Sequence, residues 1–223
     1  QCRSWVNSVV APIVKEKGDA GSVIEVFLTS WPLSVLPGFG FGITFADRTV
    51  PFRCGTWQND GAIRAFPVYL KHTYDKDATV FLDPVSIMSF EGPCATQIRA
   101  CLEEERVKYV FLSVNIDTNH WICLVIDLDA KKIYVYDSVK SRIISKVMAG
   151  LAKKLMRQVL KDKYMEQVIK TPTQKDCNSC GIFVCRYFGL CDSSEAPTDL
   201  TPTGIERLRC MGTSCLRRSQ RGP

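Results

Sequence analysis

The stretch NHWICLVIDLDAKKIYVYDS, residues 119–138, decides the fold of this chain. Its two runs of β-branched and aromatic residues, 120–128 and 132–138, flank a short break near Asp129. Such runs are typical of strands, and a break of this length is typical of the turn in an antiparallel hairpin. The run YVFLSVNI at 109–116 has the same composition. The sequence therefore predicts three strands of one sheet.

His120 and Asp137 stand at the two ends of this predicted hairpin. Opposed residues of a hairpin lie at equal distances from the turn, and the midpoint between these two positions falls next to it. We therefore expect the imidazole beside the carboxylate. A carboxylate there can accept the Nδ1 proton, which fixes the tautomer and leaves Nε2 free to face a nucleophile. The only other histidine is His72, so a histidine-based mechanism has few candidates.

Cys180 is the candidate nucleophile. The apolar run at 181–190 follows the polar residues Asn178 and Ser179, which predicts a buried helix that begins at this point. At a helix N-terminus, unpaired N–H groups and the helix dipole stabilise a cysteine thiolate. Gln174 lies six residues upstream on a loop. From there its side-chain N–H can complement the Cys180 backbone N–H as an oxyanion hole.

The hairpin and the block PTQKDCNSCGIFVC, residues 172–185, resemble the signature blocks of SUMO-specific and related ubiquitin-like-protein proteases. That family has a His-Trp pair, an Asp-Ser pair that begins 17 residues after the histidine, and a glutamine six residues before a Cys-Gly pair, as this sequence has. The family's residue before the cysteine is usually aspartate, and here it is Ser179. The matching catalytic positions are His120, Asp137, Gln174 and Cys180.

The resemblance implies both a fold and an activity. The implied fold is an α+β, papain-like cysteine proteinase of the adenovirus-protease type, with a mixed sheet flanked by helices and the nucleophile at the N-terminus of a buried helix. The implied reaction is hydrolysis of the peptide or isopeptide bond after the Gly-Gly tail of a ubiquitin-like modifier, most of all a SUMO-like one, through a thioester. No cofactor or metal is required. The implied partners are the modifier and its conjugates or precursors, in the nucleus or cytoplasm.

A third block, TWQNDGAIRAF at 56–66, resembles the family's W-L-N-D element. In relatives this tryptophan and the one after the histidine flank the narrow channel that takes the Gly-Gly tail. The resemblance therefore assigns Trp57 and Trp121 to such a clamp, and Asp60 to a basic residue near the modifier's tail. Only glycine lacks a side chain that would collide with such a channel, which gives a physical reason for the selectivity.

The rest of the chain predicts further helices and two extensions. We expect helices over 57–70, ended or kinked by Pro67, and over 95–105. A long amphipathic helix is expected to bury Ile143, Val147, Leu151, Leu155 and Val159, which recur every four residues. The predicted organisation is an N-terminal extension at 1–42, a catalytic domain at 43–192 and a polar, basic tail at 193–223.

Composition excludes some classes of protein. The chain of 223 residues is 46% hydrophobic, which suits one domain with a core. It has no apolar run long enough for a membrane-spanning helix and nothing that reads as a signal peptide. Several of the eleven cysteines sit inside apolar runs, which favours a reducing compartment over secretion. The formal charge of +6 concentrates between 131 and 175, which is typical of a solvated helix face; an acidic partner is a weaker interpretation and nucleic acid weaker still.

Two alternatives stay open at this point. Effector acetyltransferases share the histidine, acid and cysteine order on the same fold but transfer an acetyl group from coenzyme A. A non-catalytic zinc or redox module could instead be built on cysteines alone. Its ligands would come from Cys177, Cys180, Cys185, Cys191, Cys210 and Cys215.

Overall fold

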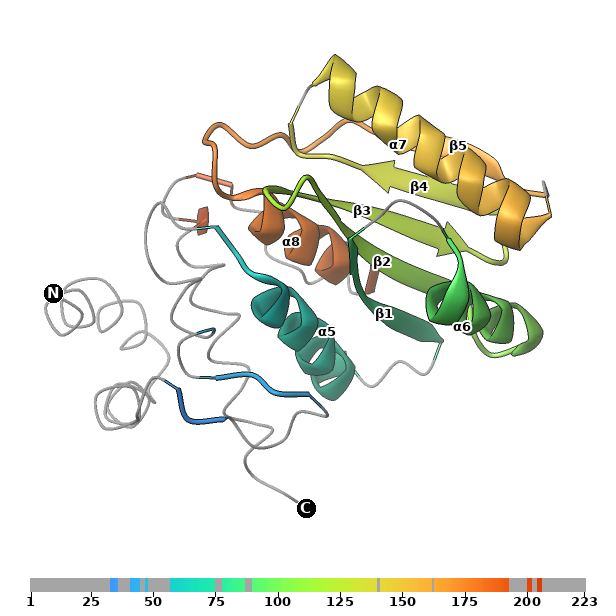
Figure 1. The fold of residues 1–223 in the computed structure, drawn as a ribbon, viewed down its shortest axis with the longest axis horizontal. Helices are drawn as coiled ribbons and strands as arrows, with labels where there is room; N and C mark the ends of the chain where they lie inside the picture. Colours follow the sequence, from blue (N-terminus) through green and yellow to red (C-terminus); the bar gives the residue numbers. More distant parts are fainter. Residues whose placement is uncertain are drawn as a thin grey trace, which may run out of the picture. The chain divides into compact units, whose positions relative to one another are not determined.

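The structure is a computed structural model that describes residues 33–35, 41–44, 47, 57–74, 78–86, 90–139, 141–161, 163–192, 200–201 and 204–205. Most of the predicted N-terminal extension and C-terminal tail lies outside these residues, as does the side chain of His72. The described residues fall into two compact units. One contains helix α5 and the other, within 74–196, contains the sheet and the remaining helices (Figure 1).

Helix α5 (Asp60–Tyr74) begins where the sequence predicts. The side-chain oxygen of Asn59 accepts a hydrogen bond from the Ala62 N–H at 2.9 Å, which caps the helix. The same side chain donates to Asp47 at 2.7 Å. The helix continues past Pro67 to Tyr74, so of the two expected effects of this proline, an end or a kink, the end is excluded. A proline removes one intrahelical hydrogen bond, and the turns on either side keep theirs.

The second unit is built on five strands in the order β1-β2-β3-β4-β5. The outer pairs are parallel and the central pairs β2–β3 and β3–β4 are antiparallel. The sheet is therefore mixed, as expected. The elements along the chain are β1 (Thr79–Ser86), α6 (Gly92–Glu103), β2 (Tyr109–Ile116), β3 (His120–Asp127), β4 (Lys132–Tyr136), α7 (Arg142–Leu155), the π-helical turn η3 (Met156–Leu160), β5 (Met165–Ile169) and α8 (Cys180–Asp192).

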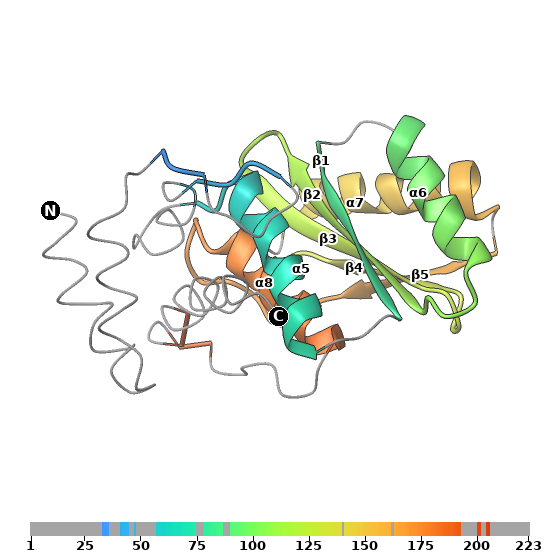
Figure 2. The ribbon, with the colours of Figure 1, turned by 90° about the horizontal axis from the view of Figure 1, so that it is seen from below.

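Two crossovers place helices on one face of this sheet. The chain steps from β1 to β2 through α6 and from β4 to β5 through α7, in the same direction across strands that point the same way. Because such crossovers are right-handed, both helices are expected on the same face. Figures 1 and 2 show α6 and α7 together on one face, and α8 on the other.

Each face of the sheet has its own apolar layer. Alternate residues of the central strands, among them Val110, Leu112, Leu124 and Ile133, join the buried side chains of α6 and α7 in one core cluster. On the opposite face aromatic rings fix α8. Phe188 meets Phe111 edge to face with ring centroids 5.0 Å apart, and Tyr187 stacks on Tyr136 at 4.6 Å. These contacts hold α8 against β2 and β4, the two neighbours of β3 in the sheet.

The three predicted strands are confirmed, and two edge strands were missed. β1 contains Pro84, which cannot donate to a sheet and which argues against a strand when only the sequence is read. An edge position tolerates it, and the register with β2 shifts between Leu82 and Val85. β5 has only five residues, two of which, Met165 and Val168, are exposed apolar side chains. It therefore carries no alternation that a sequence pattern could detect.

The amphipathic helix forms, but its buried face differs from the predicted one. Leu151, Leu155 and Val159 are buried, whereas Ile143 is 77% and Val147 40% exposed. An α-helix has 3.6 residues per turn, so residues spaced exactly four apart shift steadily around the helix axis. Ile143 and Val147 therefore face away from the core. No helix in the described ranges has the length and apolar character required to cross a membrane.

Candidate active site

His120 is the first residue of β3 and follows a tight turn. Asp117 and Thr118 in this turn have φ values of 50° and 61°, the left-handed conformation that matches the twist of a hairpin. The turn pairs Ile116 with His120. The imidazole therefore lies at the end of the sheet rather than in its middle. Its side chain is 12% exposed.

Asp137 binds this imidazole from the residue after β4. The Nε2 atom of His120 lies 2.7 Å from Oδ1 of Asp137, whose side chain is 8% exposed. The same oxygen accepts the Val139 N–H at 2.9 Å. The other oxygen, Oδ2, is buried and has no hydrogen-bond partner among the described residues. A buried carboxylate with so few partners depends on the imidazole as its counter-charge.

The imidazole lies beside the carboxylate as predicted, but the register and the ring nitrogen that makes the contact differ from the expected ones. Cys123 pairs with Tyr136, so continuing the register puts Asp137 opposite Ile122, two residues from His120 and on the same face. The carboxylate is thus diagonal to the imidazole, not directly opposite. It meets Nε2, the ring nitrogen far from the backbone, whereas Nδ1 was expected. Nδ1 is therefore the nitrogen left for the thiol.

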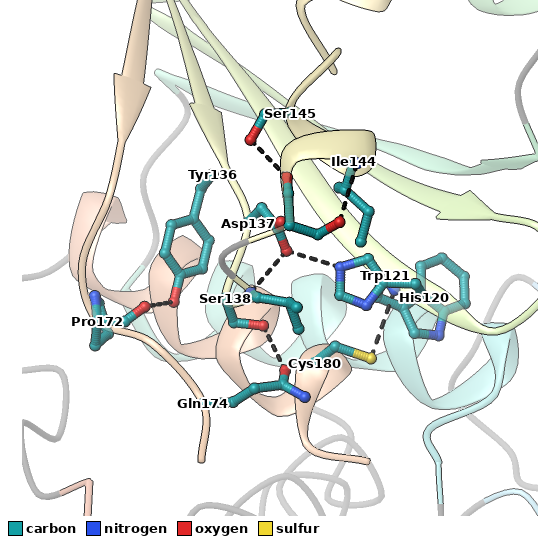
Figure 3. Close-up of polar contacts among 12 residues, drawn as sticks. His120, Trp121, Tyr136, Asp137, Ser138, Ile144, Ser145, Pro172, Gln174 and Cys180 are labelled. Carbon is teal, nitrogen blue, oxygen red and sulfur yellow. Dashed lines mark hydrogen bonds and ion pairs between the residues drawn. The ribbon is translucent and has the colours of Figure 1, made fainter. Parts of the chain in front are cut away.

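Cys180 opens helix α8, as predicted. The carbonyl of Ser179 accepts the Phe183 N–H at 3.0 Å, which makes Ser179 the cap and places the cysteine in the first turn. The thiol is 1% exposed, and its sulfur accepts the backbone N–H of Trp121 at 3.5 Å. The cysteine therefore lies at the positive end of the helix dipole and next to the strand that begins with His120 (Figure 3).

The electrostatics of His120 favour its protonated form. Burial by itself lowers the pKa of the imidazole, but hydrogen bonds to Asp137 and Cys180 and the negative charges of both groups outweigh it and raise the pKa to about 9. An imidazolium is thus present at neutral pH. A cation beside a cysteine stabilises the thiolate, which is the nucleophilic form.

Gln174 lies on the loop between β5 and α8 and is held by the turn after β4. Its backbone N–H donates to the carbonyl of Ser138 at 2.9 Å, and its Oε1 accepts the Ser138 hydroxyl at 2.5 Å. Its Nε2 donates to the carbonyl of Asp176 at 2.8 Å. A carboxamide nitrogen carries two N–H donors, so one remains after that bond.

Asp176 shapes the last turn before the cysteine. Its Oδ1 accepts the N–H groups of Ser179 at 3.1 Å and of Asn178 at 3.3 Å, and its Oδ2 accepts the Ser179 hydroxyl at 2.6 Å. Ser179 is fully buried. Asp176, three residues before Ser179, thus provides the carboxylate that holds this turn. These bonds to the backbone two and three residues on form an Asx turn, which the sequence analysis missed.

The structure brings together only part of the predicted site. His120, Trp121, Asp137, Gln174 and Cys180 come from β3, the two loops and α8 of one unit, and Figure 3 draws them in one view. The Trp121 side chain is 3% exposed.

Trp57 and Asp60 belong to the other unit. Trp57 is 43% exposed, and Asp60 is an exposed carboxylate in the first turn of α5. Their placement relative to the thiol stays a prediction. Within the part of the chain that the structure describes, no three His, Cys, Asp or Glu side chains are grouped to hold a metal ion. The side chains of Cys191, Cys210 and Cys215 lie outside that part.

The chain is similar to known proteins in sequence and in fold. The sequence is 24% identical over 162 residues to ubiquitin-like-specific protease 1 of Saccharomyces cerevisiae, a match over 69% of this chain and 26% of that protein. The chain thus spans about a quarter of the length of that relative.

Solved structures share the fold. The Ulp1 protease domain in complex with Smt3, the yeast ortholog of SUMO, superposes with a TM-score of 0.71 at 20% identity, over 92% of this chain and 96% of that one. Xanthomonas XopD gives a TM-score of 0.54 at 21% identity, over 70% of this chain and 98% of that one. The predicted α+β fold of the adenovirus-protease type is confirmed.

A family model fits more than half of the sequence. The model for the C-terminal catalytic domain of the Ulp1 protease family matches residues 95–210, a span that includes His120, Asp137, Gln174 and Cys180. The chain belongs to the Ulp1 protease family.

Proposed function

We propose that this chain is a cysteine peptidase that hydrolyses the peptide or isopeptide bond after the Gly-Gly tail of a SUMO-like modifier. One observation carries the proposal: Asp137 binds the His120 imidazole at 2.7 Å, and the Cys180 sulfur accepts the backbone N–H of Trp121, the residue next to this histidine. A thiol, a base and an acid in this order are the parts of a nucleophilic triad. Family membership and the likeness to a relative bound to Smt3 support the choice of substrate.

Acylation follows from the charges of the site. The Cys180 thiolate attacks the carbonyl carbon of the last glycine, and the carbonyl oxygen becomes an oxyanion. The backbone N–H of Cys180 and the remaining N–H of Gln174 stabilise this oxyanion. The imidazolium of His120 then gives its proton to the leaving amine. The carbon–nitrogen bond breaks, and the modifier stays attached to Cys180 as a thioester.

Deacylation uses the same residues in reverse. His120, now neutral, accepts a proton from a water molecule that attacks the thioester carbonyl. The second oxyanion collapses, the carbon–sulfur bond breaks and the modifier leaves with a free carboxylate. Asp137 stabilises the imidazolium each time it forms and holds the ring through Nε2. Neither step needs a metal or cofactor.

Selectivity is proposed to come from the tryptophans. Trp121 follows the base directly and presents its backbone N–H to the thiol, which supports the proposal that it lies next to the scissile bond. Trp57 has an exposed ring and is proposed as the second wall of the channel for the Gly-Gly tail. Asp60, an exposed residue three positions after Trp57, is proposed to contact a basic residue of the modifier.

The proposed partners are the modifier and its precursors or conjugates, in the nucleus or cytoplasm. Six cysteine side chains that the structure describes take part in no disulfide. Thiols that are not oxidised to disulfides suit a reducing compartment.

The test is covalent capture by modifiers that carry a C-terminal electrophile. SUMO, ubiquitin and a third ubiquitin-like modifier, each with a vinyl sulfone in place of the C-terminal carboxylate, are incubated with the protein. We expect SUMO to form an adduct fastest, and peptide mapping to place it on Cys180.

Cys177→Ala is the matched control, because this neighbouring thiol is exposed and free. It should label like the wild type, whereas Cys180→Ala should not label. A protein that captures none of the three modifiers, or that transfers acetyl groups from acetyl coenzyme A to a target, would overturn the proposed function. Preferred capture of ubiquitin would overturn the choice of substrate alone.

A further inference from the structure

We propose that Ser138 is a positioning residue that fixes the orientation of the Gln174 carboxamide for oxyanion binding. This inference rests on the proposed function. The two residues are far apart in the sequence, and the turn after β4 brings them together (Figure 3). Ser138 contacts Gln174 twice, through its backbone carbonyl to the Gln174 N–H and through its hydroxyl to Oε1.

The orientation of a carboxamide decides whether it helps or harms the reaction. One end carries two N–H donors and the other carries only an acceptor, although the two ends have nearly the same shape. With the nitrogen toward the substrate, an N–H stabilises the oxyanion. With the carboxamide oxygen toward the substrate, its partial negative charge would face the negative charge of the oxyanion. The protein therefore needs a device that selects one orientation.

Hydrogen bonds at both ends of the Gln174 carboxamide supply that device. The carbonyl of Asp176 can only accept, so it requires the nitrogen end of the side chain, which it binds at 2.8 Å. The oxygen end is then directed to the Ser138 hydroxyl at 2.5 Å, where the hydroxyl donates. Rotating the group by half a turn would set the Gln174 oxygen against the Asp176 carbonyl, so that carbonyl selects the orientation and the Ser138 hydroxyl holds the oxygen end in place.

Burial makes the hydrogen bond from the Ser138 hydroxyl difficult to replace. The Ser138 side chain is 1% exposed, so water has little access to replace its hydroxyl. A hydrogen bond in such a dry site is costly to leave unmade. The loop itself has further anchors, because the Tyr136 hydroxyl donates to the carbonyl of Pro172 at 2.7 Å and the Ser138 carbonyl holds the Gln174 backbone. Loss of the serine hydroxyl therefore frees the carboxamide while the loop stays attached.

The position of Ser138 also links the two halves of the chemistry. It directly follows Asp137, which orients the base, and it precedes Val139, whose N–H binds the same carboxylate. One short turn thus holds the imidazole through Asp137 and the oxyanion donor through Ser138. The Asp-Ser pair that the sequence shows therefore has two separate tasks.

The test is a double-mutant cycle on hydrolysis of SUMO carrying a C-terminal aminomethylcoumarin. Ser138→Ala is expected to lower kcat by about 10-fold with little change in KM, the size expected for one hydrogen bond. In a Gln174→Ala background the same substitution should have no further effect, because the group that it orients is gone. A serine with only a structural role would instead lower kcat equally in both backgrounds.

Two controls separate this role from damage to the fold or to the nucleophile. Ser113→Ala removes another buried serine hydroxyl, 2% exposed, on β2 and should retain the wild-type kcat. Alkylation of Cys180 by iodoacetamide forms no oxyanion, so Ser138→Ala should leave its rate unchanged.

The outcomes distinguish this inference from the proposed function. A wild-type kcat in Ser138→Ala, an equal loss in both backgrounds or slowed alkylation would each overturn the inference alone. A wild-type protein that neither captures nor hydrolyses any modifier would overturn the proposed function and this inference with it.

Discussion

The Nε2 atom of His120 lies 2.7 Å from Oδ1 of Asp137, and the two residues are diagonal neighbours at the end of the β3–β4 pair. The carboxylate thus binds the ring nitrogen far from the backbone, and Nδ1 is left to the thiol at the start of α8. Because the imidazole has a negative partner on each side, its pKa is raised to about 9 despite burial. His120 is therefore protonated at neutral pH, next to the proposed nucleophile Cys180.

The first prediction concerns the pH dependence of the wild type. Protonated His120 is needed to protonate the leaving amine, and its proton is retained until the pH approaches about 9. The value of kcat/KM for SUMO-aminomethylcoumarin should therefore fall on the alkaline side near pH 9. An alkaline limb near the ordinary histidine value of 6.5 would mean that the imidazolium is not stabilised in the free enzyme.

The second prediction concerns Asp137→Asn. The amide keeps the shape of the side chain but removes the charge that raises the pKa of His120. We expect kcat/KM to fall by about 10²- to 10⁴-fold, as the stabilised imidazolium and the fixed ring orientation are lost. The alkaline limb should also move to lower pH. Asp129→Asn on the exposed β3–β4 turn is the matched control and should change neither quantity.

If the alkaline limb of the kcat/KM profile of Asp137→Asn stayed at the wild-type pH, this would contradict the ion pair between His120 and Asp137, even if the rate fell. The rate alone can fall through local damage, whereas the limb reports the charge next to the imidazole. Both measurements on one variant therefore separate loss of structure from loss of the ion pair.

The third prediction concerns Cys180→Ala. Turnover should vanish because no other thiol occupies the helix N-terminus, while binding of SUMO should remain, because the contacts proposed for the tail do not involve sulfur. Calorimetry with SUMO that ends in Gly-Gly measures the affinity, and the fluorogenic substrate measures turnover. Residual hydrolysis in this variant would remove Cys180 from the mechanism.

The central strands and the buried helix could be predicted because their patterns are strong. β2 and β3 are continuous apolar runs that are buried on both faces, and the run after Cys180 is apolar all round. Edge strands are short and half-exposed, so β1 and β5 leave weaker patterns. Pro84 in β1 even argues against a strand.

The parts of the site that were predictable are those fixed by spacing along the chain. The positions of His120, Asp137 and Cys180 follow from one hairpin and one helix start. The choice of Nε2 follows from a register offset of two residues, which spacing alone does not resolve. The hydrogen bond from Ser138 to Gln174 depends on the path of the loop between β5 and α8. A contact between residues so far apart in the sequence leaves no local pattern.

The last prediction concerns Gln174→Ala. Its side chain is proposed to supply one of two donors to the oxyanion, a bond that strengthens only as negative charge develops. Removing one such donor typically costs about 10² to 10³ in kcat. We expect a loss of this size for SUMO-aminomethylcoumarin with KM nearly unchanged, since the ground-state carbonyl gains little from the bond.

Gln167→Ala is the matched control for this substitution, because Gln167 is an exposed glutamine on the edge strand β5. It should retain the wild-type kcat. Alkylation of Cys180 by iodoacetamide should proceed at the same rate in both variants, since the thiolate–imidazolium pair does not include either glutamine. If Gln174→Ala instead raised KM without lowering kcat, the residue would bind substrate and transition state equally. Gln174 would then be a substrate-binding residue and not an oxyanion donor.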